Sequence, residues 1–181
     1  MRCFISVWIC LGLLVGCATI PEEQCAQVDW YDLGIKDGRA GYGEDRLAQH
    51  REACAGVQVV PDEKRYAQGR KVGLAEYCLP DNAVREGLAG RYYKDVCNEA
   101  FKRLHRAAFE VHSLKRRINT NLDEVANKEN ELRKEKTDSR RNQLRSDIRE
   151  LDRRRESLRD DLFTAERELE RLRPARPGSR F

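Results

Sequence analysis

Cysteine is the residue type whose placement in this sequence carries the clearest chemistry. A thiol can accept a lipid, form a disulfide, bind zinc or act as a nucleophile. The surroundings of each cysteine determine which of these roles it has. Two of the seven cysteines lie inside the N-terminal apolar run, one closes that run, and four lie in the charged chain beyond it. In order, they are Cys3, Cys10, Cys17, Cys25, Cys54, Cys78 and Cys97.

Cys17 follows the longest apolar run of the chain, CFISVWICLGLLVG, which itself follows Met1 and Arg2. One positive charge and about a dozen apolar residues are too short a span for a bilayer and are typical of a secretory signal. The ending LLVGC resembles the bacterial lipobox, in which the cysteine is acylated and becomes the mature N-terminus. We therefore predict a signal peptide over residues 1–16 and a lipid, such as palmitate, on Cys17. An ordinary cleaved signal and an uncleaved anchor are the alternatives.

The residue after Cys17 bears on the destination of the protein. Lipoproteins kept in the inner membrane commonly carry Asp there, by the same resemblance, whereas this chain has Ala18. We therefore expect a cell-envelope protein anchored in the outer membrane and facing the periplasm, provided that the host is Gram-negative.

Lipidation of Cys17 would leave four cysteines in an oxidising compartment: Cys25, Cys54, Cys78 and Cys97. An even number in that compartment predicts two disulfides, and the sequence leaves their pairing open. A zinc site is the rival interpretation. Its nearest candidate, His50 with Cys54, lacks a matching second pair of ligands. We therefore predict disulfides and no metal.

Catalytic motifs are not recognisable in this sequence. His105 and His112 lie seven residues apart on a highly charged stretch and are expected to be exposed. The signatures of serine hydrolases and zinc proteases are missing, and bridged cysteines offer no free thiol. Asp37, next to Gly38, is interpreted as a cap or turn residue. We therefore predict a protein that is not an enzyme and binds no cofactor.

The charged residues divide the mature chain into two segments. Residues 17–97 contain 11 basic and 14 acidic residues, whereas residues 98–173 contain 21 basic and 17 acidic residues. Tryptophan, tyrosine and glycine occur in the first of these segments and are missing from the second. The predicted organisation is a signal peptide (1–16), a lipid-anchored tether (17–28), a small Cys/Gly-rich domain (29–97), a charged helical hairpin (98–173) and a disordered tail (174–181).

Glycines in the first segment recur at helical spacing. Three stretches, Asp29–Tyr42, Asp62–Pro80 and Asp81–Cys97, each begin with an aspartate suited to an N-cap and carry glycines three or four residues apart. Because a glycine inside a helix costs about 1 kcal/mol relative to alanine, we expect close helix packing to offset that cost. Turns between short strands and phosphate-binding loops are the alternatives, although no phosphate-loop signature is present.

The same residues resemble a family of bacterial lipoproteins, domain of unknown function twenty-seven ninety-nine (DUF2799). The resemblance spans Cys25 to Cys97 and implies a secreted, lipid-anchored protein with no established activity. It supplies no catalytic residues. The residues that carry it are Trp30, Gly34, Asp37, Gly38, Tyr66, Gly69, Gly73, Leu74, Tyr77, Cys78, Gly87, Gly90, Tyr92 and Cys97.

Two series of apolar residues in the second segment keep spacings near 3.5. The first comprises Leu104, Val111, Leu114, Ile118, Leu122, Val125 and Leu132, and the second Leu144, Ile148, Leu151, Leu158, Leu162, Ala165, Leu169 and Leu172. Their phase breaks inside the polar stretch KEKTDSRRNQ, which predicts a turn with Asp138 or Ser139 capping the second helix. We therefore predict a mainly α protein with an antiparallel coiled-coil hairpin. A continuous helix that dimerises in parallel is the alternative.

These features together predict a non-enzymatic binding or scaffolding protein that acts through the hairpin. Its partner would be an envelope protein or a second copy, and export excludes nucleic acid. Arg140 and Arg141, at the hairpin tip, are the predicted contact residues, with peptidoglycan or anionic headgroups as further targets. The alternative function is a peptidoglycan or glycan-binding module, in which Trp30, Tyr66 and Tyr77 would form a stacking surface.

Overall fold

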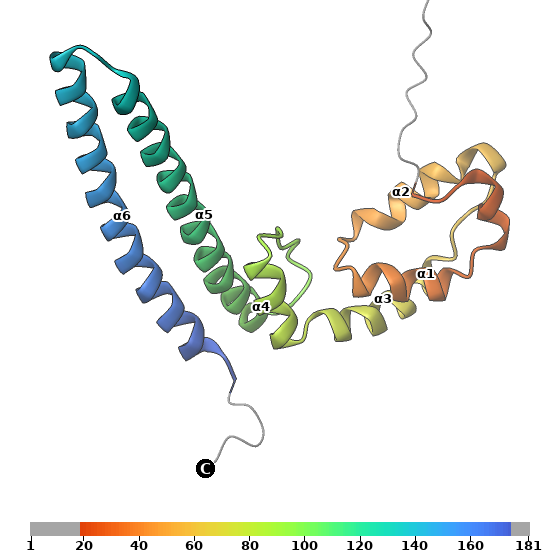
Figure 1. The fold of residues 1–181 in the computed structure, drawn as a ribbon. Coiled ribbons are helices and arrows are strands. Elements are labelled where there is room, and N and C mark those ends of the chain that lie inside the picture. The colour runs from red at the N-terminus through yellow and green to blue at the C-terminus, as the bar shows by residue number, and fades with distance from the viewer. Residues whose placement is uncertain (1–18, 175–181) are drawn as a thin grey trace, which may run out of the picture.

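The computed structural model describes residues 19–174, and all of its regular structure is helical (Figure 1). The predicted fold class is therefore confirmed. Cys17, the predicted signal peptide and nearly all of the predicted tail lie outside the described residues. In chain order the elements are η1 (Glu22–Gln27), α1 (Trp30–Arg39), α2 (Asp45–Ala53), η2 (Ala55–Val57), α3 (Glu63–Tyr77), α4 (Pro80–Leu88), α5 (Glu99–Lys134) and α6 (Asp138–Leu172).

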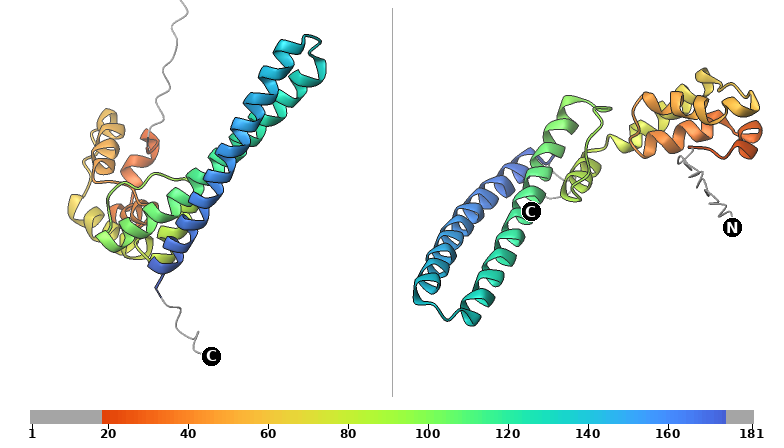
Figure 2. Two further views of the ribbon diagram at one scale, coloured as in Figure 1. Left: turned by 90° about the vertical axis from the view of Figure 1, so that its left-hand side faces the viewer. Right: turned by 90° about the horizontal axis from the view of Figure 1, so that it is seen from above.

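The helices form three parts that follow one another along the chain (Figures 1 and 2). The N-terminal module comprises η1, α1, α2, η2 and the part of α3 that packs on α1. The base comprises α4 and the ends of α5 and α6 that lie near it. The arm is the α5–α6 hairpin, which extends away from the module. No helix within residues 19–174 has both the length and the apolar character needed to cross a bilayer.

Glycines bring α1 and α3 into close contact. A Cβ added to either Gly38 or Gly73 would lie only 2.9 Å from the Cα of the other. Gly34 and Gly69 face the backbone of the opposite helix in the same way, and Gly87 of α4 faces α5. The prediction that glycine faces allow close helix packing is therefore confirmed, and these glycines do not mark turns between strands.

Two disulfides join the four predicted cysteines. Cys25 pairs with Cys54, and Cys78 pairs with Cys97. The first bridge lies in a hydrophobic cluster of the module, with Trp30 among its members. The second borders the separate cluster of the base. The prediction of two disulfides is confirmed, and Cys54, being bridged, is not available as a zinc ligand beside His50.

Residues 19–28, which were predicted as part of a tether, are folded onto the module. Ile20 and Cys25 are buried in its hydrophobic cluster. The apolar side chain of Ile20 and the Cys25–Cys54 bridge hold this segment in place. The base likewise crosses the predicted boundary at residue 97, because its cluster joins residues of α4 to residues of α5 and α6.

The helix boundaries agree with the predicted caps in two of four cases. Asp29 and Asp62 accept hydrogen bonds from backbone N–H groups of the first turns of α1 and α3. Asp81 does not cap α4, because Pro80, whose fixed φ suits the first helical position, begins that helix. At the start of α6 the N-cap residue is Thr137, and Asp138 is already helical.

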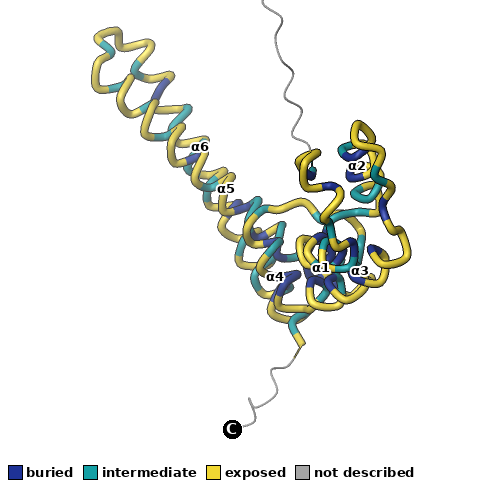
Figure 3. The backbone as a smooth tube through the Cα atoms, turned by 90° about the vertical axis from the view of Figure 1, so that its right-hand side faces the viewer, coloured by how far each residue is buried: buried dark blue, intermediate teal, exposed yellow. Residues whose placement is uncertain are grey.

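The arm is an antiparallel hairpin, so the alternative of one continuous helix is excluded. The turn consists of residues 135–137, where the Glu135 carboxylate accepts hydrogen bonds from the backbone N–H groups of Lys136 and Thr137. Each helix is about 50 Å long at 1.5 Å per residue. Figure 3 shows separated buried positions along the arm, in contrast with the denser burial where α1 meets α3.

One predicted position of the arm seam is wrong. Leu122 is exposed, and the buried side chain is that of the neighbouring Asn121. Asn121 lies seven residues after the buried Leu114, so it continues the heptad that Leu122 was expected to continue. Its Nδ2 donates to the backbone carbonyl of Leu151, at 3.1 Å, and thereby joins the two helices.

Candidate functional site

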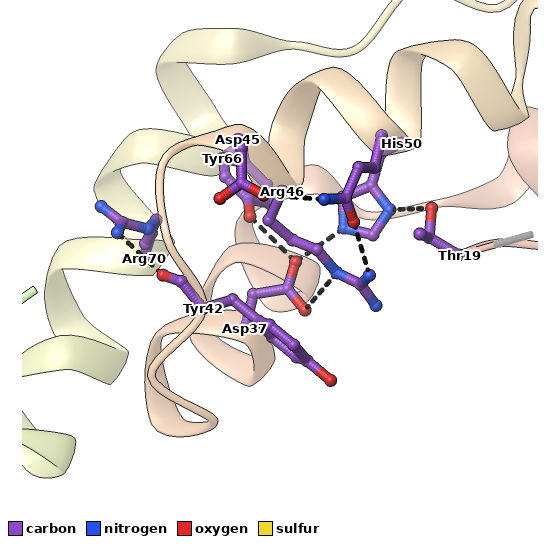
Figure 4. Close-up of polar contacts among 9 residues, drawn as sticks. Thr19, Asp37, Tyr42, Asp45, Arg46, His50, Tyr66 and Arg70 are labelled. Atoms are coloured by element: carbon purple, nitrogen blue, oxygen red, sulfur yellow. Dashed lines mark hydrogen bonds and ion pairs between the residues drawn. The ribbon is translucent and has the colours of Figure 1, made fainter. Parts of the chain in front are cut away.

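A chain of hydrogen bonds runs through the interior of the module (Figure 4). The hydroxyl of Thr19 lies 2.6 Å from His50 Nδ1, and His50 Nε2 lies 2.6 Å from Asp37 Oδ2. The same carboxylate oxygen accepts a hydrogen bond from the Tyr66 hydroxyl at 2.8 Å. Asp37 is 3% exposed and His50 is 1% exposed. We call these four residues the Asp37 network.

Each member of the Asp37 network comes from a different element. Asp37 lies on α1, His50 on α2, Tyr66 on α3, and Thr19 begins the described chain. Asp37 follows Gly34 by three residues, so it shares the face of α1 that the glycines bring against α3. The network therefore ties three helices and the N-terminal segment to one carboxylate.

The donors and acceptors fix how protons are placed in the network. A carboxylate only accepts hydrogen bonds, so His50 Nε2 carries a proton toward Asp37. In a neutral imidazole the other nitrogen accepts, and the Thr19 hydroxyl then donates to Nδ1. Every polar group along this line has a partner, which is the condition for burying such groups without a large cost.

The pKa values of two members move in opposite directions. Burial disfavours the Asp37 carboxylate, but the hydrogen bonds from His50 and Tyr66 favour it, and the pKa of Asp37 lies below its ordinary 3.8. The pKa of Tyr66 is raised by its burial and by its hydrogen bond to the charged Asp37. Asp37 is therefore ionised and Tyr66 neutral at neutral pH.

Arg46 adds a positive charge at the edge of the network. Its Nε lies 3.9 Å from Asp37 Oδ1, and its guanidinium lies 4.3 Å from the centre of the Tyr42 ring. The ammonium of Lys94, in the loop between α4 and α5, lies 4.6 Å from the same ring centre. The Tyr42 ring therefore contacts one cation of the module and one cation of the loop between α4 and α5.

A hydroxyl, an imidazole and a carboxylate in line are also the parts of a hydrolase triad. In this protein, however, the imidazole is enclosed, and the carboxylate is shared with Tyr66. Five grooves on the described surface lie along α4, α5 and α6, and neither Asp37 nor His50 lines any of these five. This geometry suits a structural role, in which the network holds the module together.

The predicted aromatic contact surface requires correction. Trp30, Tyr66 and Tyr77 are all buried, the first two in the module cluster and the third in the base cluster. Because these rings are buried, they are not available for stacking on a ligand. Exposed aromatic rings lie elsewhere: Tyr92 is 87% exposed, with its ring centre 5.7 Å from that of Phe109, and Phe163 on α6 is exposed as well.

The predicted contact residues of the arm lie where they were expected. Arg140 and Arg141 are in the first turn of α6, next to the hairpin turn. Arg140 is exposed and lies 3.4 Å from Glu131, whereas Arg141 is half-buried and donates to the backbone carbonyl of Glu135. Arg140 is therefore the freer of the two for a partner.

Two predictions about polar residues of the module and base were wrong. Asp37 is not a cap or turn residue, because α1 continues through it to Arg39. His105 is not exposed; it is buried, and its Nε2 lies 3.0 Å from the backbone carbonyl of Arg91. Burial lowers the pKa of His105, which favours the neutral imidazole.

The Asp37 network was missed because no local pattern marks it. Asp37 and His50 are 13 residues apart, and Tyr66 is 29 residues from Asp37. They meet only because α1, α2 and α3 are packed together in the module. The one available signal was that Asp37 lies on the glycine face of α1, where a charged residue needs partners.

Comparison with known proteins supports the resemblance seen in the sequence. Residues 29–111 match the family model described as protein of unknown function (DUF2799). The match begins at the N-cap of α1 and ends inside α5, so it includes Asp37, His50 and Tyr66. Neither a curated protein nor a solved structure matches this chain. Residues 29–111 of this chain are therefore similar to DUF2799, the family that the sequence already resembled, whose members are proteins of unknown function.

Proposed function

We propose that this protein is a lipid-anchored component of the bacterial cell envelope that binds or scaffolds a partner through its arm and catalyses no reaction. The arm is the observation that carries the proposal. Among the described elements, α6 packs extensively only on α5, and α5 only on α6 and α4. Beyond the base cluster, the outer part of this long, charged hairpin packs extensively on no other described element, which suits contact with another molecule.

The surface of the arm favours a protein partner. Leu122 and Phe163 are exposed on it. Several residues of the predicted seam, including Ile118, Val125 and Leu151, are only half-buried. Covering such a seam with further helices would bury apolar surface, and burial of this kind drives association. The partner is another envelope protein or a second copy of this chain.

Shortening the arm tests the binding role. A deletion of residues 119–155, with Ile118 and Glu156 joined by a glycine-rich turn, removes the outer arm and keeps the base cluster. Chemical crosslinking in cells, followed by mass spectrometry, should identify partners of the wild type that the shortened chain loses. The thermal unfolding of the module serves as a control for folding. Retention of every partner by the shortened chain would contradict the proposal.

Lipidation rests on the sequence around Cys17 and needs its own experiment. Labelled palmitate should be incorporated by the wild type and by Cys10→Ala, and not by Cys17→Ala. Cys10 is the matched control, because it is a cysteine of the same apolar segment. Incorporation of label into Cys17→Ala would show that the acyl chain is attached elsewhere.

A glycan-binding module is the second candidate, and the exposed Tyr92 is the observation that favours it. Its ring lies beside that of Phe109, which is half-buried, so an aromatic face is open to a sugar ring. Under this alternative, purified peptidoglycan should retain the arm-shortened chain and release Tyr92→Ala. Under the first proposal, neither change affects sedimentation with peptidoglycan.

A further inference from the structure

The end of α2 and the loop that follows it form an uncharged segment between charged residues. Residues 53–61, ACAGVQVVP, carry no charge, although charged residues make up 36% of the sequence. Within this loop Val57 is 43% exposed and Val60 is 76% exposed. Single apolar residues are common on protein surfaces. Two of them on one uncharged loop point to an apolar environment for that loop.

The loop is held in a defined conformation. At its start Cys54 is bridged to Cys25, and the backbone N–H of Val59 donates to the carbonyl of Cys54 at 3.3 Å. Val59 packs against the module cluster, and Pro61 is buried. Gln58, which precedes Val59, adopts a left-handed conformation, with φ of 58°. The two exposed valines are therefore presented outward from a fixed framework.

The loop lies next to the N-terminal segment of the described chain. Thr19 contacts His50 on α2, and Cys25 of η1 is bridged to Cys54 at the end of that helix. A Cβ added to Gly56 in η2 would lie 2.6 Å from the Glu22 carboxylate. In Figure 1 the described chain begins beside α2, and the red segment with η1 reaches the end of α2 that leads into the loop.

The few residues between Cys17 and the folded module limit how far the module can lie from a lipid on Cys17. Thr19 follows Cys17 by two residues, and an extended chain spans at most about 3.6 Å per residue. The attachment point therefore lies within about 7 Å of Thr19, which the Asp37 network holds against α2. A lipid at Cys17 would place the surface of the module directly at the bilayer, with no free tether between them.

We propose that the loop of residues 55–60 is a second membrane contact, with Val57 and Val60 inserted at the interface of the bilayer. This inference rests on the proposed lipidation of Cys17. The lipid supplies the affinity, and the loop fixes the orientation of the module on the bilayer. Because α3 joins the module to the base, the same contact would set the direction of the arm.

The charges around the loop indicate the lipid class that it meets. Acidic residues outnumber basic ones there, with Glu22, Glu23, Glu52 and Asp62 against Arg51. An anionic surface repels such a rim, whereas a zwitterionic headgroup offers an ammonium to it. The loop therefore prefers phosphatidylethanolamine to phosphatidylglycerol.

Fluorescence quenching by brominated lipids tests the insertion. The lipid-modified full-length mature chain carrying Val60→Trp is reconstituted into vesicles of phosphatidylethanolamine with brominated acyl chains. Its added emission should be shifted to the blue and mostly lost to quenching. Val72→Trp is the matched control, because Val72 is a 43% exposed valine on α3, and its emission should be unchanged. The buried Trp30 contributes the same background to both variants.

Hydrogen exchange on the wild-type chain gives a readout that needs no substitution. Amides of residues 55–60 should exchange more slowly on vesicles than in the chain without lipid, and the exposed amides of the loop after α4 should not. Slower exchange in both loops would indicate that the whole chain is shielded and would overturn the proposal.

The outcomes separate this inference from the proposed anchoring. If the chain floats with vesicles and the Val60→Trp emission is unquenched, the loop contact is wrong and the lipid anchor stands. Equal quenching of both variants also overturns the loop contact. A lipid-modified chain that does not float overturns both proposals. Stronger quenching after addition of phosphatidylglycerol would show that the assigned lipid class is wrong.

Discussion

α1 and α3 contact each other through glycine, whereas α5 and α6 are held apart by leucine and isoleucine side chains. In the module, backbone approaches backbone, a disulfide closes the cluster, and the buried Asp37 has defined partners. In the arm, a narrow seam contains buried Leu144 and Leu158 together with the polar Asn121. The module therefore has one well-determined arrangement, and the arm is held by contacts that helices from another molecule could supplement.

This comparison predicts the largest loss of stability when a disulfide of the module is removed. Replacement of Cys25 and Cys54 by alanine should cost about 2–5 kcal/mol of unfolding free energy, because the cluster that the bridge closes is small. Urea unfolding without reductant measures the loss. The matching change at Cys78 and Cys97 should cost less, because the helices of the arm also support the base cluster. A larger loss of unfolding free energy for the Cys78 and Cys97 replacement would contradict this view of the two regions.

Glycine substitutions test the close contact of α1 and α3. Gly73→Ala should destabilise the module by about 1–3 kcal/mol, because the new methyl group meets the backbone of α1. Gly43→Ala is the control, since the group nearest to its added Cβ is the movable side chain of Asp45. Thermal unfolding followed by circular dichroism compares them. A Gly73→Ala chain as stable as the control would show that the helices can move apart at little cost.

Asp37→Asn should destabilise the module by about 1–3 kcal/mol at neutral pH, because it removes the charge that His50 and Tyr66 share. The pKa of Asp37 is lower in the folded chain than its ordinary 3.8. Ionised Asp37 therefore stabilises the fold above pH 3.8, and this contribution is lost as the pH falls through the lower folded value.

Urea unfolding at several pH values measures this dependence. The stability of the wild type should fall more steeply below pH 3.8 than that of Asp37→Asn, so that the two curves converge in acid. Glu76→Gln is a control, because Glu76 pairs with Arg39 at the exposed surface and such pairs contribute little. Parallel curves for wild type and Asp37→Asn would show that Asp37 is not the group whose protonation matters.

The sequence predicted what depends on local pattern and missed what depends on packing between distant residues. Heptad spacing and the polar break between Lys134 and Gln143 predicted the hairpin, because seam and turn are encoded in adjacent residues. Glycine spacing likewise predicted close helix contact. The choice of disulfide partners and the meeting of Asp37 with His50 depend on how α1, α2 and α3 are placed in space. No spacing within one helix contains that information.

The smallest predicted effect concerns Asn121. It distinguishes the contribution of this residue to the register of α5 against α6 from its contribution to the stability of the arm. Asn121→Leu should stabilise the arm by about 1 kcal/mol, because a buried polar side chain is replaced by an apolar one in the seam. It also removes the hydrogen bond to the carbonyl of Leu151, which favours one register of α5 against α6. Thermal unfolding should show the gain, and analytical ultracentrifugation should show new oligomers formed by arms that pair in other ways.

Asn130→Leu, at an exposed position of the same helix, is the control and should change neither measurement. A more stable Asn121→Leu chain with an unchanged oligomeric state would mean that the leucines alone specify the hairpin register.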